Sequence, residues 1–173
     1  MDMLSHLKSR GVMDRHVVHF ADEEATFYLF TPTGQFSGVQ YYRPLADKKK
    51  RNDEFGKYMT KSTPGYTPVF GFDQLDYSKD YCFVQEGIFD AIPLQNLGFN
   101  AVAILTYSNK QALLQLRLLF KNIYSIVDDD ASGLKLGRIV DEYEVADEDV
   151  GDMYTGGKSI ELGLLACKLV YKK

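Results

Sequence analysis

The chain has 173 residues, a formal net charge of −4 at pH 7 and a hydrophobic content of 45%. This length suits one domain, or a domain with a small additional lobe, and it is enough to bury a core without disulfides or a structural metal. Proteins that bind nucleic acid through backbone charge alone are usually basic, so any phosphate contact is expected to be local, through a basic segment or a metal ion.

The sequence gives no sign of a membrane or secretory destination. No apolar run approaches the roughly 18–20 residues needed to span a bilayer. Residues 1–15 lack the apolar segment of a secretory signal. Cys82 and Cys167 lie far apart and have no zinc-binding spacing. We therefore expect a cytoplasmic protein (in the host cytoplasm if it is viral) without a membrane partner.

Residues 1–78 predict a small N-terminal α+β lobe, which begins with a short helix or an irregular lead-in. Two strands are expected over Ala25–Phe30 and Phe36–Arg43, because aromatic residues and Val dominate both and Pro and Gly lie between them. The polar stretch from Ala46 to Lys61, which contains the basic run Lys48–Arg51, is expected to be an exposed loop.

Residues 79–173 predict a mainly parallel sheet flanked by helices, since short apolar runs alternate with helical patterns. The three apolar runs expected to be strands cover residues 81–84, 101–105 and 123–127. A helix over Ile88–Leu97 is expected to end at Gly98, with Pro93 tolerated only in its first turn.

Two further helices are expected in this part of the chain. The first follows the capping types Ser108 and Asn109 and covers Gln111–Lys121. Its buried face is expected to consist of Ala112, Leu116, Leu119 and Phe120. The second, over Ser159–Tyr171, would close the fold, although Gly163 weakens it.

Acidic residues follow two of the predicted strands, and ligands of parallel sheets gather beyond the carboxyl ends of strands. Glu86 follows the first strand, and Asp128, Asp129 and Asp130 follow the third. If the chain stays extended, Asp128 and Asp130 point to the same side. Two such charges about 4–5 Å apart repel by roughly 1 kcal/mol in water, and a hard divalent cation removes that repulsion. A solvated acidic turn is the alternative.

Two segments, Phe83–Ala91 and Ile126–Gly133, resemble the Toprim domain of bacterial and phage DNA primases. That family has an apolar strand leading into EGxxDA and a second apolar strand leading into DxDxAG. The resemblance implies that Asp128 and Asp130 are metal ligands, and that Glu86 is a catalytic acid/base or a metal-linked carboxylate. Asp90, one helical turn after Glu86, is a weaker candidate ligand that could instead cap its helix.

The resemblance extends in both directions from these motifs. Lys57-Tyr58-Met59 with Pro68–Gly71 is similar to the KYLNSP…LYG stretch of primase catalytic cores, which implies that Arg43, Lys57 and Lys61 bind template or nucleotide phosphate. Solvated loop charge is the alternative for the two lysines.

Glu148–Met153 looks like the third Toprim acidic motif and makes Asp149 a candidate ligand and Asp152 a weaker one. Glu148 stands where the family has Lys, and the interval from Gly133 leaves little room for the family's helix and strand. A solvated acidic loop over Asp141–Asp152 is therefore the alternative.

The function implied by the resemblance is metal-dependent synthesis of RNA primers on single-stranded DNA from NTPs, with Mg²⁺ or Mn²⁺. The chain has no Cys/His zinc module and no Walker A motif, so a helicase or a separate zinc-module protein is expected as a partner. No other cofactor is implied. Two alternatives stay open, namely a Toprim metal-dependent nuclease and a non-catalytic module that binds DNA or a replisome partner.

Overall fold

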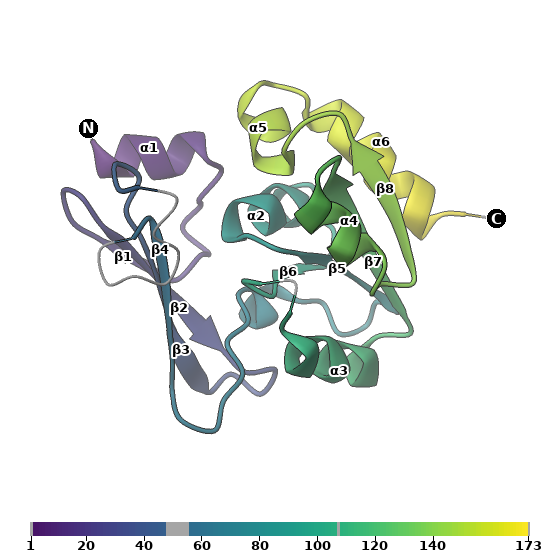
Figure 1. Ribbon diagram of the computed structural model, residues 1–173, viewed down its shortest axis with the longest axis horizontal. Helices are drawn as coiled ribbons and strands as arrows, with labels where there is room; N and C mark the ends of the chain where they lie inside the picture. Colours follow the sequence, from purple (N-terminus) through teal and green to yellow (C-terminus); the bar gives the residue numbers. More distant parts are fainter. Residues whose placement is uncertain (1, 48–55, 107, 173) are drawn as a thin grey trace.

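The computed structural model describes residues 2–47, 56–106 and 108–172. It contains two four-stranded sheets that lie side by side, one antiparallel and N-terminal, the other parallel and flanked by helices (Figure 1). The fold class expected from the sequence is therefore confirmed. No helix among the described residues is long and apolar enough to cross a membrane.

In its described residues, the N-terminal lobe consists of one helix and a meander of four antiparallel strands in the order β1-β2-β3-β4. Its elements are α1 (Met3–Ser9), β1 (Val18–Phe20), β2 (Ala25–Phe30), β3 (Phe36–Tyr42) and β4 (Tyr58–Ser62). The hairpin predicted from the first two apolar runs is β2–β3. The loop predicted over Ala46–Lys61 is wrong in its last part, because residues from Tyr58 onwards pair with β3. The basic run Lys48–Arg51 lies outside the described residues.

The parallel sheet has the strand order β6-β5-β7-β8. Its strands are β5 (Tyr81–Gln85), β6 (Ala101–Ala103), β7 (Asn122–Asp128) and β8 (Glu142–Ala146). Phe70, which precedes a 3₁₀ turn at Phe72–Gln74 (η1), pairs with Ala103 and adds a short antiparallel bridge at one edge. All five residues of β5 are buried, as expected for a central strand covered on both faces.

Five helices cover this sheet or follow its strands. They are α2 (Ile88–Asn96), α3 (Lys110–Leu119), α4 (Ala131–Gly137), α5 (Val150–Thr155) and α6 (Ser159–Val170). Gly98 follows α2 with φ 88°, the left-handed conformation that ends helices, and Asn109 caps α3 by accepting from the Ala112 N–H, both as predicted.

Two expectations about these helices are wrong. Pro93 lies in the interior of α2, beyond its first turn, so the helix accommodates a missing N–H there. Leu119 is exposed, whereas Ala112, Leu116 and Phe120 are buried. Phe120 reaches the core because it adopts an extended conformation as the C-cap of α3, outside the helical repeat.

The segment between Gly133 and Asp149 contains more regular structure than its length suggested. It holds the rest of α4 and the whole of β8, and β8 pairs in parallel with β7 from Tyr124–Glu142 to Asp128–Ala146. The expected shortage of room for a helix and a strand is therefore wrong. A short helix and a five-residue edge strand are enough.

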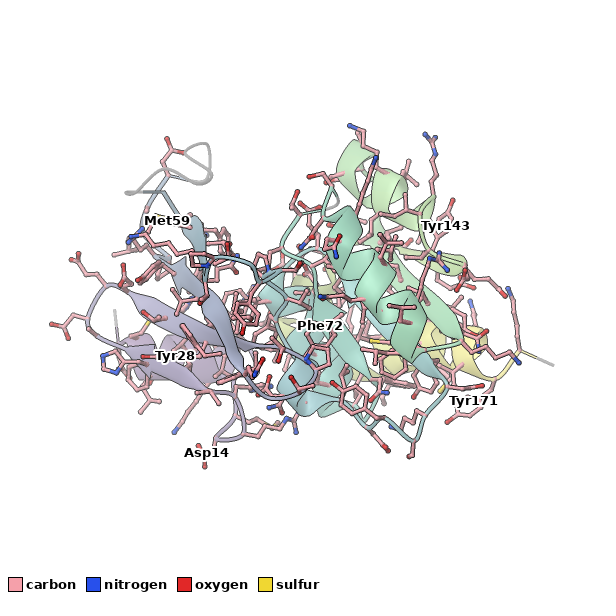
Figure 2. The ribbon with its side chains drawn as sticks, turned by 90° about the horizontal axis from the view of Figure 1, so that it is seen from below. Asp14, Tyr28, Met59, Phe72, Tyr143 and Tyr171 are labelled. Carbon is pink, nitrogen blue, oxygen red and sulfur yellow. The ribbon has the colours of Figure 1, made fainter. Side chains whose placement is uncertain are left out.

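A continuous hydrophobic core joins the two lobes. Phe27 of the N-terminal sheet packs edge-to-face against both Phe70 and Phe89, with ring centroids 5.9 and 5.8 Å apart. Figure 2 shows Met59 and Tyr28 in the N-terminal sheet, Tyr143 on the far side of the molecule and Phe72 between them. The expected boundary after residue 78 stays a prediction.

Candidate metal and phosphate site

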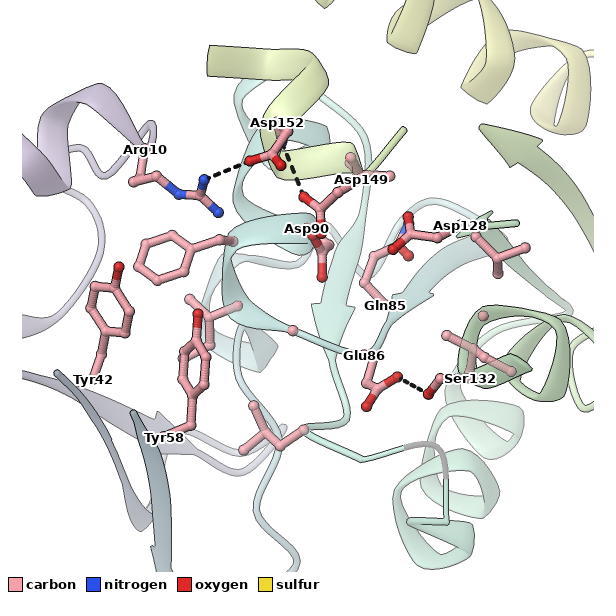
Figure 3. Close-up of a pocket in the computed structure, with 18 of the residues that line it drawn as sticks. Arg10, Tyr42, Tyr58, Gln85, Glu86, Asp90, Asp128, Ser132, Asp149 and Asp152 are labelled. Atoms are coloured by element: carbon pink, nitrogen blue, oxygen red, sulfur yellow. Dashed lines mark hydrogen bonds and ion pairs between the residues drawn. The ribbon is translucent and has the colours of Figure 1, made fainter. Parts of the chain in front are cut away.

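A cavity of about 530 Å³ opens between the N-terminal sheet and the carboxyl ends of the parallel strands (Figure 3). All six carboxylates that the sequence singled out line it, and they lie at the end of β7 or in the loops and helices that follow β5, β7 and β8. These residues are Glu86, Asp90, Asp128, Asp130, Asp149 and Asp152. The cavity thus joins acidic motifs that lie up to 66 residues apart in the chain.

Glu86 follows the last residue of β5, and its position is fixed by a neighbour from the second motif. The Ser132 hydroxyl donates to Glu86 Oε2 at 2.6 Å. The next residue, Gly87, is the N-cap of α2, and a β-carbon there would lie 2.7 Å from Asp90 Oδ2. Glycine at this position lets the Asp90 carboxylate lie against the backbone directly beside Glu86.

Asp128 and Asp130 both face the cavity, and Asp129 is absent from its lining. Asp128 ends β7, whereas Asp130 caps α4 by accepting from the Gly133 N–H at 2.6 Å. A β-carbon on Gly133 would lie 2.4 Å from the Asp128 carbonyl oxygen. The glycine therefore lets the first turn of α4 fold back against the end of β7, which keeps the two carboxylates close together.

The third acidic motif begins a helix and is not a solvated loop. Asp149 is the N-cap of α5, and its Oδ1 accepts from the Asp152 N–H at 3.0 Å. Asp152 in turn forms an ion pair with Arg10, the C-cap of α1, with Nη1 and Oδ1 3.0 Å apart. This motif is thus attached to the N-terminal lobe as well as to the parallel sheet.

Two of the carboxylates, Asp128 and Asp90, have raised pKa values. The pKa of Asp128 is raised to about 6 by burial, with further contributions from the charges of Asp149 and Asp130. Burial also raises the pKa of Asp90 well above its ordinary value, and Asp149 and Asp128 add to this effect. Burial and repulsion between neighbouring carboxylates both disfavour the charged forms, and a bound cation would offset this cost.

The structure brings one of the three predicted phosphate-binding cations into the cavity. Lys57 lines it, with Nζ 5.9 Å from the centroid of the Tyr42 ring. Arg43 and Lys61 do not line it. Both lie over the ring of Tyr41, whose neighbours in β3, Gln40 and Tyr42, are the residues that line the cavity.

Arg43 also forms an ion pair with Glu24 at 2.6 Å, which holds its guanidinium away from the carboxylates. Contacts of Arg43 and Lys61 with nucleic acid therefore stay predictions. If these contacts form, they lie on the opposite face of the N-terminal sheet from the cavity.

Arg10 is a functional candidate that sequence reasoning missed. Its guanidinium lies 4.9 Å from the centroid of the Phe89 ring, and its buried Nε has no hydrogen-bond partner among the described residues. A single sequence holds no local signal for this role, because the contact with Asp152 spans 142 residues. His6 of the same helix also lines the cavity and was missed for the same reason.

The donor chemistry of the cavity fits a hard divalent cation such as Mg²⁺ or Mn²⁺, because the potential ligands are carboxylate oxygens that repel one another. Among residues 2–47, 56–106 and 108–172, however, no three His, Cys, Asp or Glu side chains form a group that could hold a metal ion. Glu86, Asp130 and Asp149 each commit one oxygen to a hydrogen bond within the protein.

No protein-family model and no curated protein matches the chain. Solved structures do match it. The RNA polymerase domain of Mycobacterium tuberculosis primase DnaG aligns with a TM-score of 0.62 and 18% identity, over 99% of this chain and 66% of that one. The primase fragment of the bacteriophage T7 primase-helicase protein aligns with a TM-score of 0.58 and 15% identity, over 92% and 70%.

A third solved structure that matches is a DnaG primase catalytic domain bound to single-stranded DNA, with a TM-score of 0.58 and 17% identity, over 92% of this chain and 59% of that one. The chain spans between about half and two thirds of the first solved chains it matches, at 52%, 58% and 66% of their lengths. At these identities the likeness establishes the fold, which is that of primase catalytic cores.

Proposed function

We propose that this protein is a primase-like Toprim enzyme that joins ribonucleotides on a single-stranded DNA template. The observation that carries the proposal is the cavity itself. It sets the carboxylates of three strand-end motifs opposite two cations of the N-terminal lobe, Arg10 and Lys57. The similarity to solved primase catalytic cores supports the same reading.

The carboxylates would hold the metal that this chemistry uses. Asp128, Asp130 and Asp149 are the proposed ligands of Mg²⁺ or Mn²⁺, with Asp90 and Asp152 as further candidates. When bound, the metal neutralises charge on the triphosphate. Glu86 is the proposed acid/base, and Ser132 orients it by donating a hydrogen bond at 2.6 Å.

The cations would hold the phosphates from the other side of the cavity. Arg10 presents a planar guanidinium suited to two phosphate oxygens, and Lys57 adds a second charge. Since Asp152 already orients Arg10, the guanidinium is positioned before substrate arrives. The Arg10 side chain therefore loses less conformational entropy when the phosphate binds, which favours binding.

The proposed partners follow from the same reading. Single-stranded DNA is the template and NTPs are the substrates, as befits a chain whose fold matches a primase domain solved with single-stranded DNA. A replicative helicase or a separate zinc-module protein would complete the template-reading function, and one solved relative in fold belongs to a primase-helicase protein. We place the protein in the cytoplasm.

Primer synthesis tests the proposal directly. The protein is incubated with single-stranded DNA, labelled NTPs and Mg²⁺ or Mn²⁺, with and without a helicase or zinc-module partner. Oligoribonucleotides that appear with the wild type and disappear with Glu86→Gln and Asp128→Asn are the expected result. Absence of product under all conditions would refute synthesis, and Asp128-dependent cleavage of the DNA would identify a nuclease instead.

A further inference from the structure

The β3–β4 ladder presents a small patch of four side chains to the cavity. Tyr42 pairs with Tyr58 and Gln40 pairs with Thr60, so the four side chains occupy adjacent positions on one face of the sheet. All four line the cavity, whereas the intervening Tyr41 and Met59, and Lys61 after Thr60, do not. The metal and phosphate roles assigned above use none of the four.

The aromatic half of this patch is held by ring stacking, and one of its rings is partly exposed in the cavity. Tyr42 is buried and packs between His6, which stacks on it with ring centroids 5.8 Å apart, and Tyr58, which stacks on it at 5.2 Å. Its hydroxyl bonds to His6 Nε2 at 2.8 Å. Tyr58 is only half-buried. In Figure 3 its ring lies between Tyr42 and the carboxylates.

The polar half of the patch offers hydrogen bonds. The Gln40 amide nitrogen donates to the Thr60 hydroxyl at 3.0 Å, which fixes the amide plane. Gln40 is 5% exposed, yet its amide oxygen accepts no hydrogen bond from any of the described residues. Thr60 keeps its own O–H to donate. An acceptor and a donor therefore lie side by side in the wall of the cavity.

We propose that this patch is a nucleobase subsite, in which a base stacks on Tyr58 while Gln40 and Thr60 form hydrogen bonds with an edge of the same base. The inference rests on the proposed function, since it assigns the base of the nucleotide whose phosphates the carboxylates and cations hold. A flat aromatic ring beside an orientated amide suits a purine or pyrimidine, which has a π-face and polar edges.

The layout of the cavity agrees with this ligand. Lys57 directly precedes Tyr58 in the chain, and its Nζ also lies near the Tyr42 ring. A nucleotide stacked on Tyr58 therefore has a cation for its phosphates one residue away and the carboxylates across the cavity. The volume, about 530 Å³, lies within the range of pockets that hold small ligands.

Binding measurements on the whole chain test the subsite without requiring catalysis. ATP, GTP, CTP, UTP and inorganic tripolyphosphate are titrated calorimetrically in Mn²⁺. In the wild type we expect at least one nucleotide to bind about tenfold more tightly than tripolyphosphate. Tyr58→Leu is expected to remove this difference and leave tripolyphosphate affinity unchanged, whereas Tyr58→Phe keeps it. Gln40→Met is expected to alter the order of preference among the four bases.

The outcomes separate the subsite from the proposed function. Equal wild-type affinity for all four nucleotides and tripolyphosphate would overturn the subsite and leave the phosphate site standing. A Tyr58→Leu variant that loses tripolyphosphate and nucleotide affinity equally would also overturn it, by showing that Tyr58 is structural. Failure of every ligand to bind would remove the phosphate site and the subsite together.

Discussion

The two walls of the cavity are built in different ways. The carboxylate wall holds Glu86, Asp90, Asp128, Asp130, Asp149 and Asp152, and the N-terminal wall holds His6, Arg10, Gln40, Tyr42, Lys57, Tyr58 and Thr60. On the parallel-sheet side two of the carboxylates are fixed by local caps, from Asp130 to Gly133 and from Asp149 to Asp152. On the N-terminal side the side chains are fixed over long distances, and the Arg10–Asp152 pair spans 142 residues. The carboxylate wall therefore depends on strand ends and helix caps, whereas the opposite wall depends on how the lobes pack. We therefore expect a substitution in one wall to leave the structure of the other wall largely unchanged.

The largest expected effect comes from removing the central charge of the carboxylate wall. Asp128→Asn should lower metal-dependent primer synthesis by about 10³-fold or more, because the site loses the carboxylate that ends β7. The metal-free variant should unfold at the same or a higher temperature than the wild type. The reason is that burial, and to a lesser extent the charges of the neighbouring carboxylates, raise the Asp128 pKa, so its charge is disfavoured in the fold.

Asp129→Asn is the matched control for this variant. It removes the same charge one residue away, at a position that does not line the cavity. Its activity and melting temperature should stay close to the wild type. Equal losses in both variants would show that net charge, and not the Asp128 position, controls the site.

The next largest expected effect is a loss of stability when the backbone packing at Gly133 is disturbed. Gly133→Ala should lower the free energy of unfolding by about 2–4 kcal/mol, because its β-carbon would lie 2.4 Å from the Asp128 carbonyl oxygen. Gly163→Ala in α6 is the control, since the nearest atom there is Leu97 Cδ1 at 4.0 Å. That change should raise stability by about 0.5–1 kcal/mol. Urea unfolding measures both, and a neutral Gly133→Ala would contradict the packing.

The sequence predicted the carboxylate wall well because its determinants are local. A buried strand, an acidic residue and a helix that needs a cap and a glycine all lie within a few positions, as at Asp128–Gly133. The opposite wall could not be predicted in this way. Whether Lys57 or Lys61 faces the cavity depends on the β3–β4 register, and the predicted loop over Ala46–Lys61 excluded that register altogether.

Arg10 tests the N-terminal wall by itself. Arg10→Met should weaken tripolyphosphate binding in Mn²⁺ by about 10–30-fold, because a charged hydrogen-bond donor is lost from the cavity. Stability should fall by only about 1 kcal/mol, since the ion pair to Asp152 is partly exposed to solvent. Lys8→Met, on the exposed side of the same helix, should change neither quantity. A large stability loss with unchanged binding would make Arg10 a structural residue.

A contact between the N-terminal lobe and α2, away from the cavity, should make stability depend on pH by a smaller amount. His16 is buried; its Nδ1 accepts from the Met13 N–H at 2.9 Å, and its Nε2 bonds to Gln95 Oε1 at 3.1 Å, which suits the neutral ring. Burial lowers its pKa below 6.5, with Arg15 acting in the same direction and Asp73 against it. The unfolded chain therefore binds the extra proton first as the pH falls.

Stability should accordingly decline as the pH falls below about 6.5, by about 1.4 kcal/mol for each unit by which folding lowers the His16 pKa. Asp128 acts in the opposite direction, because its raised pKa makes the metal-free fold take up a proton between about pH 6 and pH 4. Urea unfolding between pH 7.5 and pH 5 in EDTA compares Asp128→Asn with Asp128→Asn/His16→Gln, because the shifted pKa values of His6 and Asp90 are common to both proteins. The second protein should show the smaller loss of stability as the pH falls, and equal slopes would show that His16 titrates normally in the fold.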